Sequence, residues 1–288
     1  MSIAKNLAQK IGLQQSDKLE CWMSTASKIK RARLLYRERG LKWLAVSALG
    51  ELPVLPSIFA KMANIAMPSG PFVALAGVHS NQLWHERRSS IRRVAGQFLT
   101  KPCDVLEVGT WMGKGSTQVW LQTLPAGSSL TLVDAWRPYI AEGETAAATV
   151  GMDGLHHVAI NTTLKEIYKN EARLSVSLVR AESKNFLPLL KDQSFDLIYI
   201  DGSHYYADAK RDMQEAKRLL RPGGVICGDD LDTAPRDDLV ALARANMESD
   251  LFVLPDGNAF HPGVLLAVTE EFERVNCENG FWWTDPVH

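Results

Sequence analysis

The chain has 288 residues, of which 46% are hydrophobic and 23% are charged, and this balance excludes a protein that is disordered throughout. Its formal net charge of -1 excludes a strong positive field over the whole molecule, so we expect no nucleic-acid partner. The length suits one large α/β domain with an extension.

Residues 1–85 are predicted to form a helical extension, and residues 86–288 the main domain. Within the extension, residues 28–42 carry seven Lys or Arg side chains against Glu38 alone. Two interpretations of this basic stretch remain open, a solvated helix face and a surface for a membrane or a partner.

We expect neither a signal peptide, because residues 1–12 lack a long apolar stretch, nor a transmembrane helix. The nearest candidate, the uncharged run 62–85, is interrupted by Pro68, Gly70 and Pro71. The cysteines form no C-x-x-C pair, so neither a zinc site nor a redox dithiol is indicated. We expect a cytoplasmic protein with reduced thiols.

From residue 86 onward, short apolar runs alternate with amphipathic helical patterns, which predicts a doubly wound, mostly parallel sheet of the α/β class. Two further apolar runs, 251–255 and 263–272, are expected to pair as an antiparallel hairpin at one edge and to complete seven strands. The other strands are predicted at 103–109, 129–136, 174–182, 195–204 and 224–230, and helices at 85–99, 113–124, 183–191, 207–220 and 237–248.

The segment from Glu107 to Ser116 joins the first of these strands to a helix and is rich in glycine. It is not a P-loop. Three residues, rather than four, separate Gly109 from the Gly113-Lys114 pair, and Gly115 follows the lysine where a P-loop has Ser or Thr. It also lacks the G-x-G-x-x-G spacing of a nicotinamide site. Two interpretations remain. The segment is either a strand–turn–helix that binds no ligand or a cofactor-binding turn of the pattern E-x-G-x-x-x-G.

The pattern E-x-G-x-x-x-G resembles motif I of class I S-adenosylmethionine-dependent methyltransferases, which have a Rossmann-like fold. By this resemblance, Glu107 contacts the methionine end of the cofactor or organises its bound water, and Gly109 and Gly113 line the cofactor. The helix that begins near Ser116 offers free backbone N–H groups to the same ligand.

Further cofactor contacts are expected at the ends of the second and third predicted strands. Asp134 can accept hydrogen bonds from both ribose hydroxyls, although capping the next segment is an alternative role. Glu182 and Ser183 are weaker candidates for the adenine edge. Trp111 and Trp136 flank these turns, and both stacking on adenine and core packing remain open.

Three carboxylates follow the fourth and fifth predicted strands, namely Asp201, Asp229 and Asp230. Carboxylates at the ends of buried parallel strands are costly unless a cation pairs with them. Hard oxygen ligands suit Mg²⁺ or Mn²⁺ better than zinc, and Asp201 is also expected to border the cofactor. His204 could take a proton from an acceptor hydroxyl, whereas a histidine bonded to nearby backbone is the alternative.

The segments VLEVGTWMGKGST, FDLIYIDGSHYYADAKRDM and LLRPGGVICGDDL resemble the metal-dependent macrocin and mycinamicin sugar O-methyltransferases. The resemblance covers roughly residues 100–265. It implies that Asp201, Asp229 and Asp230 bind Mg²⁺ and that His204 is the general base. The implied reaction moves a methyl group from S-adenosylmethionine to a hydroxyl of a small molecule, such as a sugar, a phenol or another natural product. The extension 1–85 would then be an acceptor lid or a contact in a homo-oligomer.

Two other function classes remain open. A metal-dependent hydroxylase of the cephalosporin hydroxylase type shares this layout, but the sequence shows no cluster of two histidines and one carboxylate of the kind that binds non-heme iron. A non-catalytic binding protein would have no use for clustered carboxylates. His261 is expected either to face the acceptor pocket or to cap a turn.

Overall fold

The computed structural model describes residues 33, 36, 37, 41, 83, 85–137, 158–170 and 172–286. Contacts divide the chain into two units, Met1–Ala66 and Met67–His288. Most of the predicted extension lies outside the described residues, so its helical character is observed only at residues 33, 36, 37 and 41. No helix among the described residues is long and apolar enough to cross a membrane.

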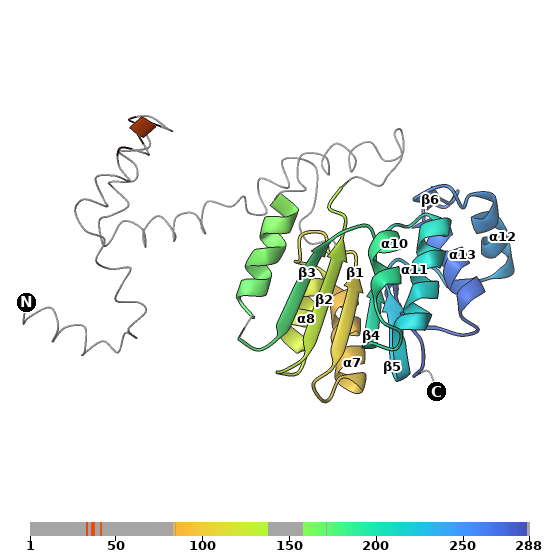
Figure 1. Cartoon of the computed structure of the whole chain (residues 1–288). Helices are drawn as coiled ribbons and strands as arrows, with labels where there is room; N and C mark the ends of the chain where they lie inside the picture. Colours follow the sequence, from red (N-terminus) through yellow and green to blue (C-terminus); the bar gives the residue numbers. More distant parts are fainter. Residues whose placement is uncertain are drawn as a thin grey trace, which may run out of the picture. The chain divides into compact units, whose positions relative to one another are not determined.

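The second unit is built on a seven-stranded sheet with the order β3-β2-β1-β4-β5-β9-β8 (Figure 1). Strand β9 pairs antiparallel with β5 and with β8, whereas all other pairs are parallel, which confirms the predicted fold class. The strands are β1 Asp104–Val108, β2 Ser129–Asp134, β3 Ser175–Arg180, β4 Phe195–Ile200, β5 Leu220–Gly228, β8 Asn276–Glu278 and β9 Phe281–Trp283.

Helices cover both faces of this sheet, because successive side chains of a strand point to opposite faces. On one face, Val105 and Leu197 pack with α7 and α8. On the other, Leu106 and Ile198 pack with α11, α12 and α13. The helices are α7 His85–Phe98, α8 Ser116–Thr123, α10 Ser183–Phe186, α11 Tyr206–Leu219, α12 Asp237–Ala245 and α13 Pro262–Glu271, with a 3₁₀ turn at Leu187–Leu189 and a further helical stretch at 158–168.

The prediction of an edge hairpin from residues 251–255 and 263–272 is wrong for the second strand. Residues 263–272 lie mostly in α13, and β6 (Phe252–Val253) pairs instead with β7 (Ala259–Phe260) in a separate two-stranded sheet. Pro262 occupies the first helical position, where its fixed φ favours helix. All residues from Pro262 to Val268 are buried, so the apolar run has no periodicity that would distinguish a helix from a strand.

The edge of the main sheet is formed by a hairpin that the sequence reading missed. Asn279 and Gly280 join β8 to β9 with φ angles of 55° and 83°. An Asn-Gly pair with positive φ at both residues is the signal of a two-residue hairpin turn. This hairpin places the Trp282 indole against the end of β5, where its Nε1 donates a hydrogen bond to the Asp229 carbonyl at 3.2 Å.

Candidate functional site

The acidic residues identified from the sequence converge at one edge of the sheet, where the parallel strands end. The backbone continues the strand ladder into the loops, since Asp201 N–H bonds Val108 O at 2.7 Å and Asp229 N–H bonds Ile200 O at 3.1 Å. The order of the strands in the sheet reverses at β1, which has β2 on one side and β4 on the other. Ligands of doubly wound sheets bind at such a point.

The turn after β1 fits tightly against the start of the loop that follows β4. Gly109 has φ +89°, and a Cβ there would lie 1.7 Å from the carbonyl oxygen of Asp201. A Cβ on Gly113, at φ +66°, would lie 2.9 Å from Cα of Thr163. Only glycine fits at these two positions. The turn predicted to hold a cofactor therefore lies directly beside Asp201, although packing within the chain already explains both glycines.

Glu107 is fully buried under this turn. The Ser116 hydroxyl donates to its Oε1, while its Oε2 has no hydrogen-bond partner among the described residues. Burial raises the pKa of Glu107 to about 8, against the opposing hydrogen bond from Ser116. A buried carboxylate oxygen without a donor is the kind of group that a ligand N–H, ammonium or bound water would satisfy.

Asp134 links the turns after β1 and β2. It accepts hydrogen bonds from the backbone N–H groups of Thr110 and Trp111 at 2.8 Å and of Trp136 at 2.6 Å. Its side chain thus caps backbone groups, the alternative role considered above, and its contact with ribose stays a prediction. Trp111 and Trp136 both have positive φ, at 50° and 44°, a strained conformation of the kind that clusters at functional sites. Trp136 is buried beside Met112, as core packing requires.

The two residues predicted at the adenine edge are held by other side chains. Glu182 forms ion pairs with Arg137 and with Lys184. Ser183 bonds the buried Asp212 of α11, whose pKa is raised to about 7, chiefly by burial. Their contact with adenine stays a prediction, and Asp212 is a buried carboxylate that the sequence reading did not single out.

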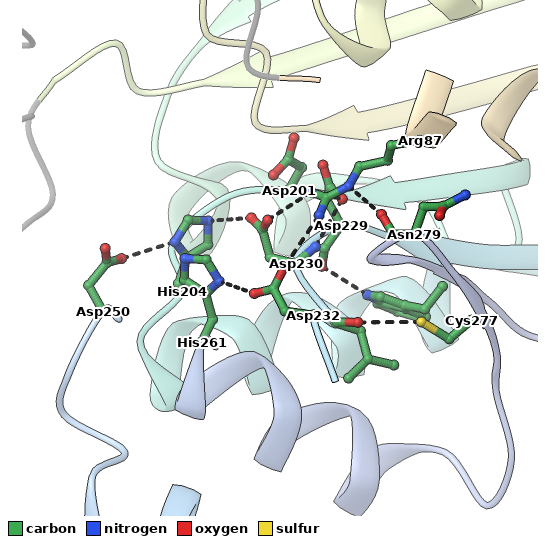
Figure 2. A network of polar contacts seen from close by, with 12 residues as sticks. Arg87, Asp201, His204, Asp229, Asp230, Asp232, Asp250, His261, Cys277 and Asn279 are labelled. Atoms are coloured by element: carbon green, nitrogen blue, oxygen red, sulfur yellow. Dashed lines mark hydrogen bonds and ion pairs between the residues drawn. The ribbon is translucent and has the colours of Figure 1, made fainter. Parts of the chain in front are cut away.

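Asp201, Asp229 and Asp230 lie together, with Arg87 of α7 among them (Figure 2). Nη1 of Arg87 is 2.6 Å from Asp229 Oδ1 and 3.0 Å from Asp230 Oδ1. Its Nη2 is 3.3 Å from Asp232 Oδ1, and its Nε donates to the carbonyl of Asn279 at 2.7 Å. Arg87 therefore neutralises part of the cluster and connects it to the β8–β9 turn.

His204 stands at the other side of the cluster, between two carboxylates. Its Nε2 is 3.0 Å from Asp230 Oδ2, and its Nδ1 is 3.0 Å from Oδ1 of Asp250. The ring of His261 packs edge-on against it, with centroids 4.3 Å apart, and Nδ1 of His261 is 2.8 Å from Asp232. Figure 2 shows both histidines joined to carboxylates in this way.

A small hollow with room for about one water molecule adjoins these groups. Its polar wall includes Asp201, His204, Asp229 and Asp230, and its apolar wall includes Val264 of α13 and Trp282 of β9. The site thus combines acidic and basic groups around a small hollow.

Residues 106–231 match a family model described as a methyltransferase domain. This stretch contains the turn after β1 and the three clustered aspartates. This match confirms the methyltransferase class that the glycine-rich turn predicts.

Among solved structures, the chain is similar to TomG from Streptomyces achromogenes, an O-methyltransferase involved in tomaymycin synthesis and solved with SAM. The identity is 14%, over 81% of this chain and 96% of that chain, and the TM-score is 0.46. An O-methyltransferase from Bacillus cereus in complex with SAH is 15% identical over 81% and 97%, with a TM-score of 0.44. No curated protein matches. These likenesses are too low to transfer an activity, cofactor or acceptor to this chain.

Asp201 is the third carboxylate of the cluster, and the charge of His204 acts on its pKa in the opposite direction to the charges of Asp229 and Asp230. The Tyr199 hydroxyl lies 3.4 Å from Asp201, and burial, followed by the charges of Asp229 and Asp230, raises the pKa of Asp201 well above its ordinary value. Asp201, Asp230 and His204 each offer a ligand atom within 4.8 Å of the others. These three residues could hold a metal ion, whereas Asp229, which contacts Arg87, is not part of that group.

Sequence reading missed several residues of this site. No pattern in the sequence marks Arg87, Asp232 or Asp250, and the sequence leaves the role of His261 open. The expectation of no cluster of two histidines and one carboxylate is wrong, because His204, His261 and Asp250 bring ligand atoms within 4.8 Å of one another. These residues are up to 57 positions apart in sequence, so no local motif reveals them.

Glu107→Gln is expected to remove a pH-dependent loss of stability. The folded pKa of about 8 lies above the ordinary 4.5, so the folded protein binds more protons between these values. Stability then falls as the pH rises through this window, by on the order of 4 kcal/mol for this group. Urea unfolding at pH 5.5 and 8 should show a smaller fall for Glu107→Gln than for wild type. Glu278→Gln, at an exposed position, is the control, and equal falls in all three proteins would contradict the prediction.

Proposed function

We propose that the protein is a divalent-metal-dependent O-methyltransferase that moves the methyl group of S-adenosylmethionine to a hydroxyl of a small-molecule acceptor. The observation that carries this proposal is the position of the partly buried Asp201, which lies between the turn at Gly109 and His204 and whose pKa is raised by desolvation and by two neighbouring aspartates. Donor, cation and base would then meet within one pocket.

The residues of the turn would bind the donor. Oε2 of Glu107 is available to the methionine end or its bound water, and the start of α8 offers free backbone N–H groups. Asp134 would hold the turn in shape and contact ribose, while Glu182 and Ser183 would border adenine. Binding in this way supplies positioning, which is the largest contribution available to a displacement at a methyl carbon.

His204 would receive the proton during transfer. The acceptor oxygen attacks the methyl carbon, the carbon–sulfur bond breaks as the carbon–oxygen bond forms, and the hydroxyl proton passes to Nε2 of His204. S-adenosylhomocysteine leaves as a neutral thioether, so no general acid is required. A divalent cation, Mg²⁺ or Mn²⁺, held by Asp201, Asp229 and Asp230 would lower the pKa of the acceptor hydroxyl and orient it.

The test is a methyl-transfer screen with protein stripped by EDTA and then supplied with Mg²⁺. We expect S-adenosylhomocysteine release with at least one sugar, phenol or polyketide alcohol, lost on stripping and lowered about 10²-fold in His204→Gln. Isothermal titration with S-adenosylmethionine separates loss of donor binding from loss of transfer. Activity that survives EDTA would remove the metal from the proposal, and absence of donor binding would favour a non-catalytic binding protein.

One observation supports a second candidate, a metal-dependent hydroxylase. His204, His261 and Asp250 supply the donor types of a non-heme iron site. Such an enzyme would consume oxygen in the presence of Fe²⁺ and a reductant, and would release no S-adenosylhomocysteine. An oxygen electrode used on the same acceptors distinguishes the two functions. The extension 1–85 remains a proposed acceptor lid or subunit contact in either case.

A further inference from the structure

Two tryptophans that follow neighbouring strands have backbone conformations that residues with a Cβ rarely adopt. Trp111 lies in the turn after β1 with φ 50°, and Trp136 follows β2 with φ 44°. Such a conformation costs free energy and persists only where the surrounding contacts fix it. Hydrogen bonds that connect these two residues with each other and with Asp134 provide those contacts.

Asp134 and the indole of Trp136 together hold both backbone polar groups of Trp111. Oδ2 of Asp134 accepts a hydrogen bond from the N–H of Trp111 at 2.8 Å, and its Oδ1 accepts one from the N–H of Trp136 at 2.6 Å. Nε1 of Trp136 then donates to the carbonyl oxygen of Trp111 at 2.7 Å. The three residues thus form a closed ring of contacts that joins the turn after β1 to the end of β2.

The indole of Trp136 is the main donor to this carbonyl oxygen. The Thr163 hydroxyl lies 3.2 Å from the same oxygen but 3.0 Å from the carbonyl oxygen of Ala159, and a hydroxyl has only one hydrogen to donate. Trp136 is 2% exposed and packs with Met112 and Ala159. Its ring therefore supports the turn from within the chain and offers no open face to a ligand.

We infer that Trp136 is a positioning residue, which holds the turn after β1 in its donor-binding conformation before the donor arrives. The inference rests on the proposed function, in which Gly109 and Gly113 of this turn line S-adenosylmethionine. Binding to a turn that is already ordered avoids the entropic cost of ordering it. The indole N–H therefore acts on donor affinity through the backbone of Trp111, and not on the transfer step.

Isothermal titration with S-adenosylmethionine tests this role without an acceptor. Trp136→Phe keeps a buried ring but removes the N–H, and we expect it to raise the Kd for S-adenosylmethionine about tenfold. The matched control is Trp120→Phe, at a fully buried tryptophan of α8 whose Nε1 has no hydrogen-bond partner among the described residues. This control makes the same change in volume without removing a bond, so its Kd should stay within about twofold of wild type.

Each outcome of the titration decides the inference. Equal rises in Kd for the two variants would assign the effect to the loss of ring volume and overturn it. If the wild type binds the donor and Trp136→Phe binds it equally well, the inference fails while the proposed function stands. If the wild type does not bind S-adenosylmethionine, the proposed function fails and the inference fails with it.

Hydrogen exchange of the donor-free protein gives an independent readout. The N–H of Trp111 bonds Asp134, and the N–H of Gly113 bonds the Thr110 carbonyl, so both should be protected while the turn is held. Mass spectrometry of a peptide covering residues 107–116 should show exchange about tenfold faster in Trp136→Phe and unchanged in Trp120→Phe. Exchange equal to wild type in both variants would show that the turn keeps its conformation without the indole bond, and would overturn the inference.

Turnover separates donor binding from transfer. With the acceptor that releases most S-adenosylhomocysteine in the screen above, Trp136→Phe should raise the KM for S-adenosylmethionine about tenfold and leave kcat within about threefold of wild type. A fall in kcat of about tenfold or more with KM unchanged would place the indole in the transfer step and overturn its assignment to donor binding.

Discussion

Asp201→Asn is expected to lower methyl transfer about 10³-fold while raising the melting temperature of the metal-free protein. Asp201 is partly buried beside two other carboxylates, and desolvation together with their repulsion raises its pKa well above the ordinary value. The amide keeps the shape of the side chain but removes the charge. The protein loses a ligand for the cation and, in the same step, a source of repulsion.

Opposite changes in activity and stability distinguish this prediction from simple misfolding. Turnover, isothermal titration with S-adenosylmethionine and Mg²⁺, and thermal unfolding after EDTA treatment provide the measurements. Donor affinity should change less than tenfold, whereas Mg²⁺ affinity should fall. Asp208→Asn is the matched control, because Asp208 is an exposed aspartate near the same loop, paired with Arg211. Turnover within threefold of wild type would exclude Asp201 from the cation site.

The parts of the fold and site that follow from the sequence depend on local pattern. Alternating apolar runs and helices predict the parallel strands, and Gly109 marks a turn where only glycine fits. Because parallel strands end at one edge, Asp201 and Asp229 could be brought together without a structure. These inferences need only the order of the strands and helices along the chain and the rule that parallel strands all end at the same edge of the sheet.

The parts that could not be predicted depend on packing between distant segments. Residues 263–272 were assigned to a strand because an all-apolar run fits a buried helix equally well. Arg87 meets Asp230 across 143 positions, and nothing in the arginine-rich α7 distinguishes it from its exposed neighbours. Asp250 lies in a segment with no motif of its own. The side chains that neutralise and orient the site are therefore visible only in three dimensions.

Arg87→Gln is expected to destabilise the metal-free protein by about 3–5 kcal/mol. Burial opposes the charge of this guanidinium, but Asp229 and Asp230 hold the pKa of Arg87 above its ordinary value. Glutamine would leave these carboxylates and Asp232 without their cation. It would also remove the hydrogen bond to the Asn279 carbonyl, which anchors the β8–β9 turn against α7.

Urea unfolding measures this loss, and Arg93→Gln is the matched control. Arg93 lies on the same helix and pairs with Glu278 at the exposed surface, so its replacement should cost less than about 1 kcal/mol. Equal losses in the two variants would show that Arg87 does not neutralise the cluster.

Magnesium gives a second readout on the same variant. The guanidinium contacts oxygens of Asp229 and Asp230, two of the three proposed metal ligands. Removing its positive charge should therefore tighten Mg²⁺ binding in isothermal titration and enlarge the rise in melting temperature that Mg²⁺ produces. If Mg²⁺ stabilises Arg87→Gln no more than it stabilises wild type, the cation and the guanidinium do not share these carboxylates, and the proposed ligand set must exclude both Asp229 and Asp230.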